Sequence, residues 1–245
     1  MKLKIMSVNI EGEKHLDKIR KLRLRESPDV ICLQEYFPET SVQIFGTQYP
    51  YQFFVPTYKV DQDEKGLKFS TTRVWGEVIA SRTPFEKTKV KYTTMDVYGS
   101  DNLPTHEIDN HIPAVLKVTT HGMQIGTTHF TWTPNGIVTD RQRAHVDELL
   151  KMIEGEEMVL AGDFNIPRGN EMYLKLAEKM KDNISSEIKT TLDPFLHYAN
   201  KNTPGKLGLV VDYIWSTPKY RVQDVQVVSG VSDHCALLAT VLLSK

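Results

Sequence analysis

Cysteine is scarce in this chain of 245 residues, which contains only Cys32 and Cys235. Both lie in apolar runs that read as strands, so we expect two buried thiols in a reducing compartment rather than a disulfide framework. Long hydrophobic runs are missing too, and none approaches the roughly 18 apolar residues of a membrane helix. The first residues lack the apolar core and the cleavage site of a secretory signal. We therefore predict a cytoplasmic protein that does not enter a membrane.

A surplus of one charge is also lacking. Lysine and arginine number 30, aspartate and glutamate 31, and the formal net charge is -1. This balance gives no overall sign of nucleic-acid binding, although a local basic patch or a bound metal can supply the positive electrostatic field that such binding needs. Hydrophobic residues make up 40% and charged residues 25%, which excludes disordered, collagen-like and coiled-coil chains. The length favours one domain, residues 1–245, and we expect a monomer.

Short apolar runs separated by turns predict about ten strands and few long helices. A helix stands between the first two strands, and this β-α-β order favours their parallel pairing. Hairpins follow, one of them turning at His121-Gly122. We therefore expect sheets packed face to face with helices outside. The expected strands are 4–10, 29–35, 74–81, 88–93, 112–119, 123–130, 157–162, 209–216, 221–228 and 235–243, and the expected helices are 13–26, 139–154 and 169–180.

Two polar stretches, 57–73 and 96–110, read as long loops. Long loops in a compact domain often carry function, and otherwise they are surface insertions. The sequence leaves both interpretations open.

Many side chains that carry chemistry stand where the predicted strands end. A single carboxylate at such a place is usually a turn or cap residue, so each one alone indicates little. Asp212 differs because it interrupts an apolar run, where a buried carboxylate without a partner is costly. A histidine is a natural partner for it. The full set is Asn9, Glu11, Gln34, Glu35, Glu77, His129, Asp163, Asn165, Asp212, Asp233 and His234.

Four motifs occur in one order: SVNI at 7–10, LQE at 33–35, GDFN at 162–165, and VDYIW at 211–215 followed by SDH at 232–234. The set resembles the endonuclease/exonuclease/phosphatase superfamily of metal-dependent phosphoesterases, which includes exonuclease III-like and deoxyribonuclease-like enzymes. The resemblance runs from Asn9 to His234. It implies an α/β fold, a four-layer α/β/β/α sandwich in which two packed mixed β-sheets are flanked by helices.

The chemistry of such enzymes explains why these residue types are needed. A phosphodiester is anionic and repels hydroxide, so a divalent cation offsets the charge while a base activates water. Mg²⁺ prefers oxygen ligands and retains several waters, so one or two carboxylates suffice to bind it. We therefore expect Mg²⁺ as the cofactor, with Mn²⁺ as an alternative.

The resemblance implies a metal-binding group of side chains. Glu35 is expected to be the principal metal ligand, and Asn9 its neighbour, donating to a ligand or to a phosphate oxygen. Glu11 stands where some relatives have an aspartate near the metal. Asp233 is expected at the metal or at a second metal site.

The resemblance also implies a catalytic group. Asp163 is expected to orient or deprotonate the attacking water, and Asn165 to hold the water or a phosphate oxygen. His234 is expected to contact the scissile phosphate, either as a cation or as an acid/base. Asp212 would accept a hydrogen bond from His234, fixing its tautomer and raising its pKa.

Glu77 and His129 match a second pair, which in the deoxyribonuclease branch places a glutamate beside another histidine. Four other histidines do not fit any of these motifs equally well. We interpret His15, His121, His145 and His197 as surface or helix-face residues.

The candidate substrate-binding residues are Trp132, Asn135 and Arg168. The segment TWTPNG at 131–136 resembles abasic endonucleases, in which a phenol precedes a Pro-Asn-Gly turn. The aromatic residue here is a tryptophan, whose indole cannot act as a phenolate. Trp132 either stacks on a base or sugar at the rim of the site or packs under a loop. Arg168 follows the GDFN motif closely enough to reach a phosphate.

Three functions remain in view. The first is hydrolysis of a phosphodiester in nucleic acid, as a nuclease or a DNA end-processing enzyme. The second is a phosphatase or phosphodiesterase acting on a small phosphorylated metabolite or a lipid headgroup. The third, a binding module without catalysis, is disfavoured because the catalytic set is complete. A long basic groove would favour the polymer, whereas a closed pocket would favour the metabolite.

Overall fold

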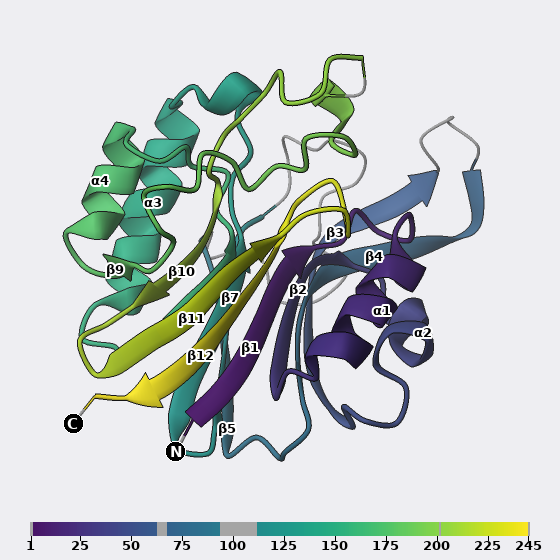
Figure 1. Ribbon diagram of the computed structural model, residues 1–245, viewed down its shortest axis with the longest axis horizontal. Helices are drawn as coiled ribbons and strands as arrows, with labels where there is room; N and C mark the ends of the chain where they lie inside the picture. Colours follow the sequence, from purple (N-terminus) through teal and green to yellow (C-terminus); the bar gives the residue numbers. More distant parts are fainter. Residues whose placement is uncertain (1, 63–67, 94–111, 201, 245) are drawn as a thin grey trace.

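The computed structural model describes residues 2–62, 68–93, 112–200 and 202–244. Two mixed β-sheets of six strands each pack against one another, and helices cover their outer faces (Figure 1). This arrangement confirms the predicted α/β sandwich.

The first sheet contains both ends of the chain. Its strand β1 (Lys2–Asn9) pairs in parallel with β2 (Val30–Tyr36) and antiparallel with β12 (Ala236–Leu243), so the predicted β-α-β opening is confirmed. The helix α1 (Leu16–Glu26) joins β1 to β2, and α2 (Ser41–Phe45) follows β2. The strand order is β11 (Tyr220–Val228), β12 (Ala236–Leu243), β1 (Lys2–Asn9), β2 (Val30–Tyr36), β4 (Lys68–Ser81) and β3 (Tyr51–Gln62).

The second sheet has a parallel pair at its centre, β7 and β8, which α3 (Asp140–Ile153) connects. The strand β10 then pairs antiparallel with β8. The helix α4 (Glu171–Ala177) lies beside α3 (Figure 1). The strand order is β5 (Lys87–Tyr92), β6 (Ala114–Thr120), β7 (Met123–His129), β8 (Val159–Asp163), β10 (Asp212–Ser216) and β9 (Lys181–Asp182).

Alternation along the strands divides the apolar side chains between two cores. Ile5 and Cys32 belong to the large cluster that also contains strands of the second sheet. Met6 and Ile31, one residue away on the same strands, pack with α1 and α2 instead. Successive side chains point to opposite faces of a strand, so β1 and β2 need apolar residues at nearly every position.

The ends of the helices agree with local sequence signals. Thr139 caps α3 as predicted, and its side-chain oxygen accepts a hydrogen bond from the backbone N–H of Gln142. The first helix starts at Leu16 rather than at residue 13, because residues 11–15 form turns. It ends at Glu26, and the next residue, Ser27, has a positive φ of 48° and precedes Pro28.

The prediction of a loop over 57–73 is wrong, because most of that segment belongs to the antiparallel strands β3 and β4. The many polar residues of this segment suggested a loop. The segment forms a hairpin nevertheless, because aromatic rings pack on one of its faces. The ring of Tyr58 lies 5.4 Å from that of Trp75, and the guanidinium of Arg73 lies 4.0 Å from the ring of Phe37. The other predicted loop, 96–110, lies outside the described residues.

In the described part of the chain, no helix combines the length and the apolar character needed to cross a membrane.

Candidate active site

The register of the strands brings the predicted catalytic residues to one edge of the sandwich. Within the second sheet, Asp163 at the end of β8 has His129 of β7 and Asp212 of β10 as its direct neighbours. Asn9 ends β1 in the first sheet. His234 stands just before β12, which runs antiparallel to β1 and therefore begins at the edge where β1 ends. Residues far apart in sequence thus meet where the two sheets face each other.

Asp163 is at the centre of the site, with only 1% of its surface exposed. Its Oδ2 accepts a hydrogen bond of 3.2 Å from Asn9 Nδ2, and its Oδ1 accepts one of 2.9 Å from the backbone N–H of Asn165. The Nε2 atoms of His129 and His234 lie 3.5 and 3.7 Å from the same Oδ2. One carboxylate oxygen therefore faces two imidazole rings.

Asn9 joins Asp163 to Glu35, because its Nδ2 also donates to Glu35 Oε1 at 2.9 Å. Glu35 has a positive φ of 54° and lies where the pairing of β2 with β4 is irregular. This backbone conformation is costly for a residue with a side chain, and such strain collects at functional sites. Glu11 and Asn165 also have positive φ, at 50° and 52°. The turns of the site therefore hold several side chains in conformations that local preference does not favour.

His234 and Asp212 form a buried pair. The Nδ1 atom of His234 lies 2.9 and 3.1 Å from the two carboxylate oxygens of Asp212. A carboxylate only accepts hydrogen bonds, so the proton is on Nδ1 of His234. The other nitrogen, Nε2, is turned toward Asp163.

The crowding of acids shifts the pKa values in the site. Burial, together with the charge of Asp233, raises the pKa of Glu35 to about 8. The hydrogen bond from Asn9 lowers this pKa but is outweighed. Burial likewise raises the pKa of Asp163 and that of Asp233. Burial alone would lower the pKa of His234, but the surrounding carboxylates outweigh it and hold that pKa well above its usual value.

The donor set fits a divalent cation. Glu35, Asp163, Asp212 and Asp233 are gathered with their charges only partly compensated, and oxygen ligands of this kind suit Mg²⁺. A bound cation would offset the burial and the repulsion from Asp233 that together raise the pKa of Glu35. Glu35 and Asp233 would hold it, because the charge of Asp233 acts directly on Glu35. Glu11 lies near by, and its charge acts on Asp233, but its carboxylate is engaged by Lys14 and His15.

Glu77 is wholly buried in β4, and burial raises its pKa well above the usual range. The backbone N–H of His129 is close enough to lower that pKa, so the structure does bring Glu77 and His129 together. The contact involves the backbone of His129 rather than its ring. Burial also lowers the pKa of the His129 imidazole.

The segment after β7 carries Trp132, which is half-buried, and Asn135, which is exposed and has a φ of 55°. Gln142 of α3 ties this segment to the GDFN turn, because its side chain donates to the backbone carbonyls of Thr131 and Asn165. The Asn165 side chain donates in turn to the Phe130 carbonyl at 2.9 Å. The amide of Asn165 is thus engaged in holding the two turns together.

Arg168, which the sequence suggested for substrate binding, makes hydrogen bonds within the protein. Its guanidinium forms an ion pair of 2.8 Å with Asp182 and donates to the backbone carbonyls of Ile184, Ser185 and Ile188. These bonds engage the two terminal nitrogens of the guanidinium, Nη1 and Nη2. Arg168 therefore fastens the chain that follows α4.

The prediction of a surface or helix-face residue is wrong for His197, whereas His145 does lie on the helix α3, on its buried face. His145 is buried and its Nδ1 lies 2.6 Å from Thr131 Oγ1, and burial lowers its pKa to about 4. His197 is also buried, and its ring lies 6.1 Å from that of His234. Burial and the charge of His234 lower the pKa of His197 to about 4. His197 belongs to none of the sequence motifs. It lies in a loop, and only the fold brings that loop to the site.

The segment Thr191–Asp193 was also missed. The hydroxyl of Thr191 accepts hydrogen bonds from the backbone N–H groups of Val211 and Asp212, each at 3.0 Å. Its carbonyl accepts one of 2.7 Å from the N–H of Cys235, and the N–H of Asp193 donates to the Asp233 carbonyl. This segment therefore connects the strand that carries Asp212 to the loop that carries His234.

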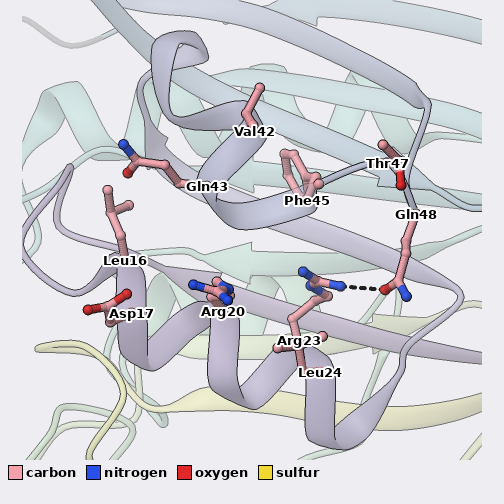
Figure 2. A pocket seen from close by; sticks show the side chains of 11 residues that line it. Leu16, Asp17, Arg20, Arg23, Leu24, Val42, Gln43, Phe45, Thr47 and Gln48 are labelled. Carbon is pink, nitrogen blue, oxygen red and sulfur yellow. Dashed lines mark hydrogen bonds between the residues drawn. The ribbon is translucent and has the colours of Figure 1, made fainter.

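A cavity of about 450 Å³ lies elsewhere, between α1 and α2 (Figure 2). Arg23 reaches from α1 to the side chain of Gln48 and to the carbonyl of Ile44. None of the predicted catalytic or metal-binding residues lines it. This cavity is therefore separate from the site at the sheet edge.

The Endonuclease/Exonuclease/phosphatase family model matches residues 6–234. The chain belongs to this family. Its members are hydrolases that act on phosphoester bonds with the help of divalent metals, and the cluster of buried acids and histidines lies within the matched region. A comparison with curated protein sequences found no match.

Solved structures of family members share the fold. A protein from Bacteroides vulgatus is 16% identical, with a TM-score of 0.70 and full coverage of both chains. One from Beutenbergia cavernae is 20% identical, with a TM-score of 0.69, covering 99% of this chain and 72% of the other. The catalytic domain of human Nocturnin, solved with bound sulfate, is 16% identical, with a TM-score of 0.66 and coverage of 99% and 95%.

Proposed function

We propose that this protein is a divalent-metal-dependent phosphodiesterase that cleaves nucleic acid. The observation that carries the proposal is the position of Asp163, whose Oδ2 faces His129 and His234 while Asn9 links it to Glu35. A base, a cationic group and a metal ligand then stand within reach of one phosphate. Hydrolysis of a phosphodiester needs these three parts.

Asp163 is the group that positions and deprotonates the attacking water. Asn9 and the backbone N–H of Asn165 hold its carboxylate in place, so its orientation is set before substrate binds. A base must lie within hydrogen-bond distance of the proton that it removes, and the Oδ2 atom lies at the meeting point of the two rings.

His234 contacts the scissile phosphate through Nε2. Asp212 fixes the ring by accepting from Nδ1, and the neighbouring carboxylates hold its pKa well above the usual value. The ring is therefore a cation at neutral pH, and it stabilises negative charge on the phosphate oxygens. Glu35 and Asp233 would hold Mg²⁺, or Mn²⁺ in its place, and the bound cation supplies charge neutralisation at the phosphate.

Exposed aromatic rings beside the site support nucleic acid as the substrate. Phe195 and Tyr198 are 67% and 64% exposed, and both flank His197. The Tyr198 ring lies 4.5 Å from the ring of His197, which in turn neighbours His234. Rings that face solvent next to a phosphate site can stack on bases, each contributing about 1–3 kcal/mol. A small phosphorylated metabolite without a base has no ring to stack on them.

Cleavage of end-labelled DNA tests the proposal. The panel holds single-stranded, duplex, abasic and 5′-blocked DNA, each with Mg²⁺ and with EDTA. We expect metal-dependent cleavage that weakens steeply as salt rises, because the substrate is held through several phosphates. Tyr198→Ala should raise KM for single-stranded DNA. Tyr220→Phe changes a tyrosine of β11 that lies away from the site and keeps its ring, so KM should stay unchanged.

Absence of cleavage of every DNA, with the protein folded, would contradict the proposal. Hydrolysis of small phosphomonoesters by the same preparation would then support the metabolite enzyme instead. Cleavage that persists in EDTA would contradict the role of the cation.

A further inference from the structure

Three buried side chains form a second group of potential metal ligands. Ligand atoms of His197, Asp233 and His234 all lie within 4.8 Å of one another. The exposed fractions of these residues are 6%, 9% and 6%. Two imidazoles and one carboxylate differ in kind from the oxygen donors around Glu35.

The donor types favour a transition metal over Mg²⁺. Imidazole nitrogen is a common ligand of Zn²⁺, whereas Mg²⁺ prefers oxygen and gives up its waters reluctantly. Three protein ligands that leave one position open are sufficient for Zn²⁺. The two groups share Asp233, and the two imidazoles of the second group make it favour Zn²⁺ over Mg²⁺.

Asp212 gives the second group a further feature of a metal site. It accepts a hydrogen bond of 2.9 Å from Nδ1 of His234, so Nε2 is the nitrogen that can ligate a cation, which takes the place of the Nε2 proton. Metal-binding histidines usually donate their other ring N–H to a carboxylate in this way. His197 is less constrained, since its Nδ1 accepts only one long bond of 3.3 Å, from the N–H of Ala199.

We propose that His197, Asp233 and His234 bind Zn²⁺, and that this cation inhibits the enzyme. The inhibition rests on the proposed function, because the Nε2 atom that would ligate Zn²⁺ is the one that we assign to the scissile phosphate. A cation on that nitrogen blocks its contact with the substrate. The Mg²⁺ ligand Glu35 stays outside the Zn²⁺ site.

Equilibrium dialysis with Zn²⁺ in excess Mg²⁺ tests the binding without any substrate. We expect a single tightly bound Zn²⁺ for the wild-type chain. His197→Gln should weaken the binding by more than the about 10–100-fold that loss of an outer-shell partner costs, because a direct ligand is removed. His121→Gln is the matched control. It lies in the turn before β7, at the end of that strand opposite His129.

Co²⁺ provides a second binding readout, since its visible absorption reports nitrogen ligands. The Co²⁺-loaded wild-type and His121→Gln proteins should both show the nitrogen-ligand band, and Zn²⁺ should change both spectra in the same way. The spectrum of Co²⁺-loaded His197→Gln should lack this band. Equal Zn²⁺ affinity for the wild type and His197→Gln would overturn the site, as would no binding by the wild type.

Inhibition is measured separately, as the ratio of Mg²⁺-dependent turnover with and without Zn²⁺ within each variant. We expect strong inhibition of the wild type and of His121→Gln, and at least about tenfold weaker inhibition of His197→Gln. Binding of Zn²⁺ at the three residues with no effect on turnover would overturn the inhibitory role. If the protein cleaves no DNA at all, the proposed function fails while the dialysis result still decides the site.

Discussion

At the scale of single residues, the site is organised by hydrogen bonds that hold charged groups in fixed orientations. Asn9 uses one amide group to join Glu35 and Asp163, which would otherwise repel each other. Asp212 fixes the tautomer of His234. Each of these bonds involves a buried polar group, for which loss of the partner costs more than the bond itself contributes. Substitutions that keep a hydrogen-bonding atom in place should therefore affect the rate before they affect folding.

Asp163→Asn should lower kcat by about 10²–10⁴-fold or more, because an amide cannot accept the proton of the attacking water. The bond from the N–H of Asn165 can be kept by the amide oxygen. We expect a circular dichroism spectrum and a thermal midpoint close to those of the wild type, with turnover measured on labelled DNA. Asp140→Asn is the control, since its carboxylate is fully exposed on α3. A near-normal rate for Asp163→Asn would remove Asp163 from the role of base.

His234→Ala should also cost about 10²–10⁴-fold in kcat, and Asp212→Asn less. Asp212 is among the charges that raise the pKa of His234, so its loss lowers that pKa. The cationic ring is the active form, and activity is lost as pH rises through the pKa. The alkaline limb of the pH–rate profile should therefore move to lower pH in Asp212→Asn. Asp182→Asn, which removes a carboxylate paired with Arg168, should leave that limb in place.

At the scale of elements, the active edge depends on a short segment without regular secondary structure of its own. Thr191 and Asp193 make hydrogen bonds to the backbone on both sides, next to Asp212 and next to His234. The Asp193 carboxylate also accepts from the N–H of Gly230, at the start of the loop that leads to His234. The distance between the two partners is thus set by a third piece of chain.

Thr191→Val should destabilise the fold by about 1–3 kcal/mol for each of the two buried N–H groups that it orphans. Urea unfolding measures this loss, and kcat should fall with it because Asp212 shifts. Thr191→Ser keeps the acceptor and loses only a methyl group, at a cost of about 1 kcal/mol. Equal destabilisation by valine and serine would show that packing, rather than the two hydrogen bonds, explains the effect of Thr191.

At the scale of the whole molecule, the edge between the two sheets stores unfavourable charge. The raised pKa values of Glu35, Asp163 and Asp233 mean that folding disfavours their ionised forms. The folded chain binds more protons than the unfolded one between the ordinary pKa of 4.5 for Glu35 and its raised value of about 8. Without a divalent cation, these groups therefore make the free energy of unfolding fall as pH rises through that window. His234, whose pKa is raised, acts in the same direction.

Mg²⁺ should raise the thermal midpoint more at pH 8 than at pH 5.5, because protons and the cation compete for the same carboxylates. Differential scanning fluorimetry with Mg²⁺ and with EDTA measures the difference. Glu35→Gln should remove most of it, and Glu148→Gln, an exposed change on α3, should not. An equal gain from Mg²⁺ at both pH values would contradict Glu35 as a ligand that is protonated without metal.

Much of the fold could be predicted from the sequence. Apolar runs such as 29–35 and 157–162 gave the central strands within two residues, because buried strands leave a continuous hydrophobic signal. The hairpin at His121-Gly122 is confirmed by positive φ at both residues. The hairpin of β3 and β4 was missed, because its side chains are polar along much of its length. Its packing also depends on Phe37, which lies outside the hairpin and contacts Trp75 of β4.

The sequence by itself determined the strand order of the opening, the family motifs and the carboxylates and histidines that they carry, because strand periodicity and motif spacing are local properties. Only the tertiary structure decided which of these side chains meet. Strand register placed His129, Asp163 and Asp212 side by side, and packing of the two sheets added Asn9 and Glu35. It also paired Arg168 with Asp182 and brought His197 to His234, because contacts between distant segments leave no periodic trace in the chain.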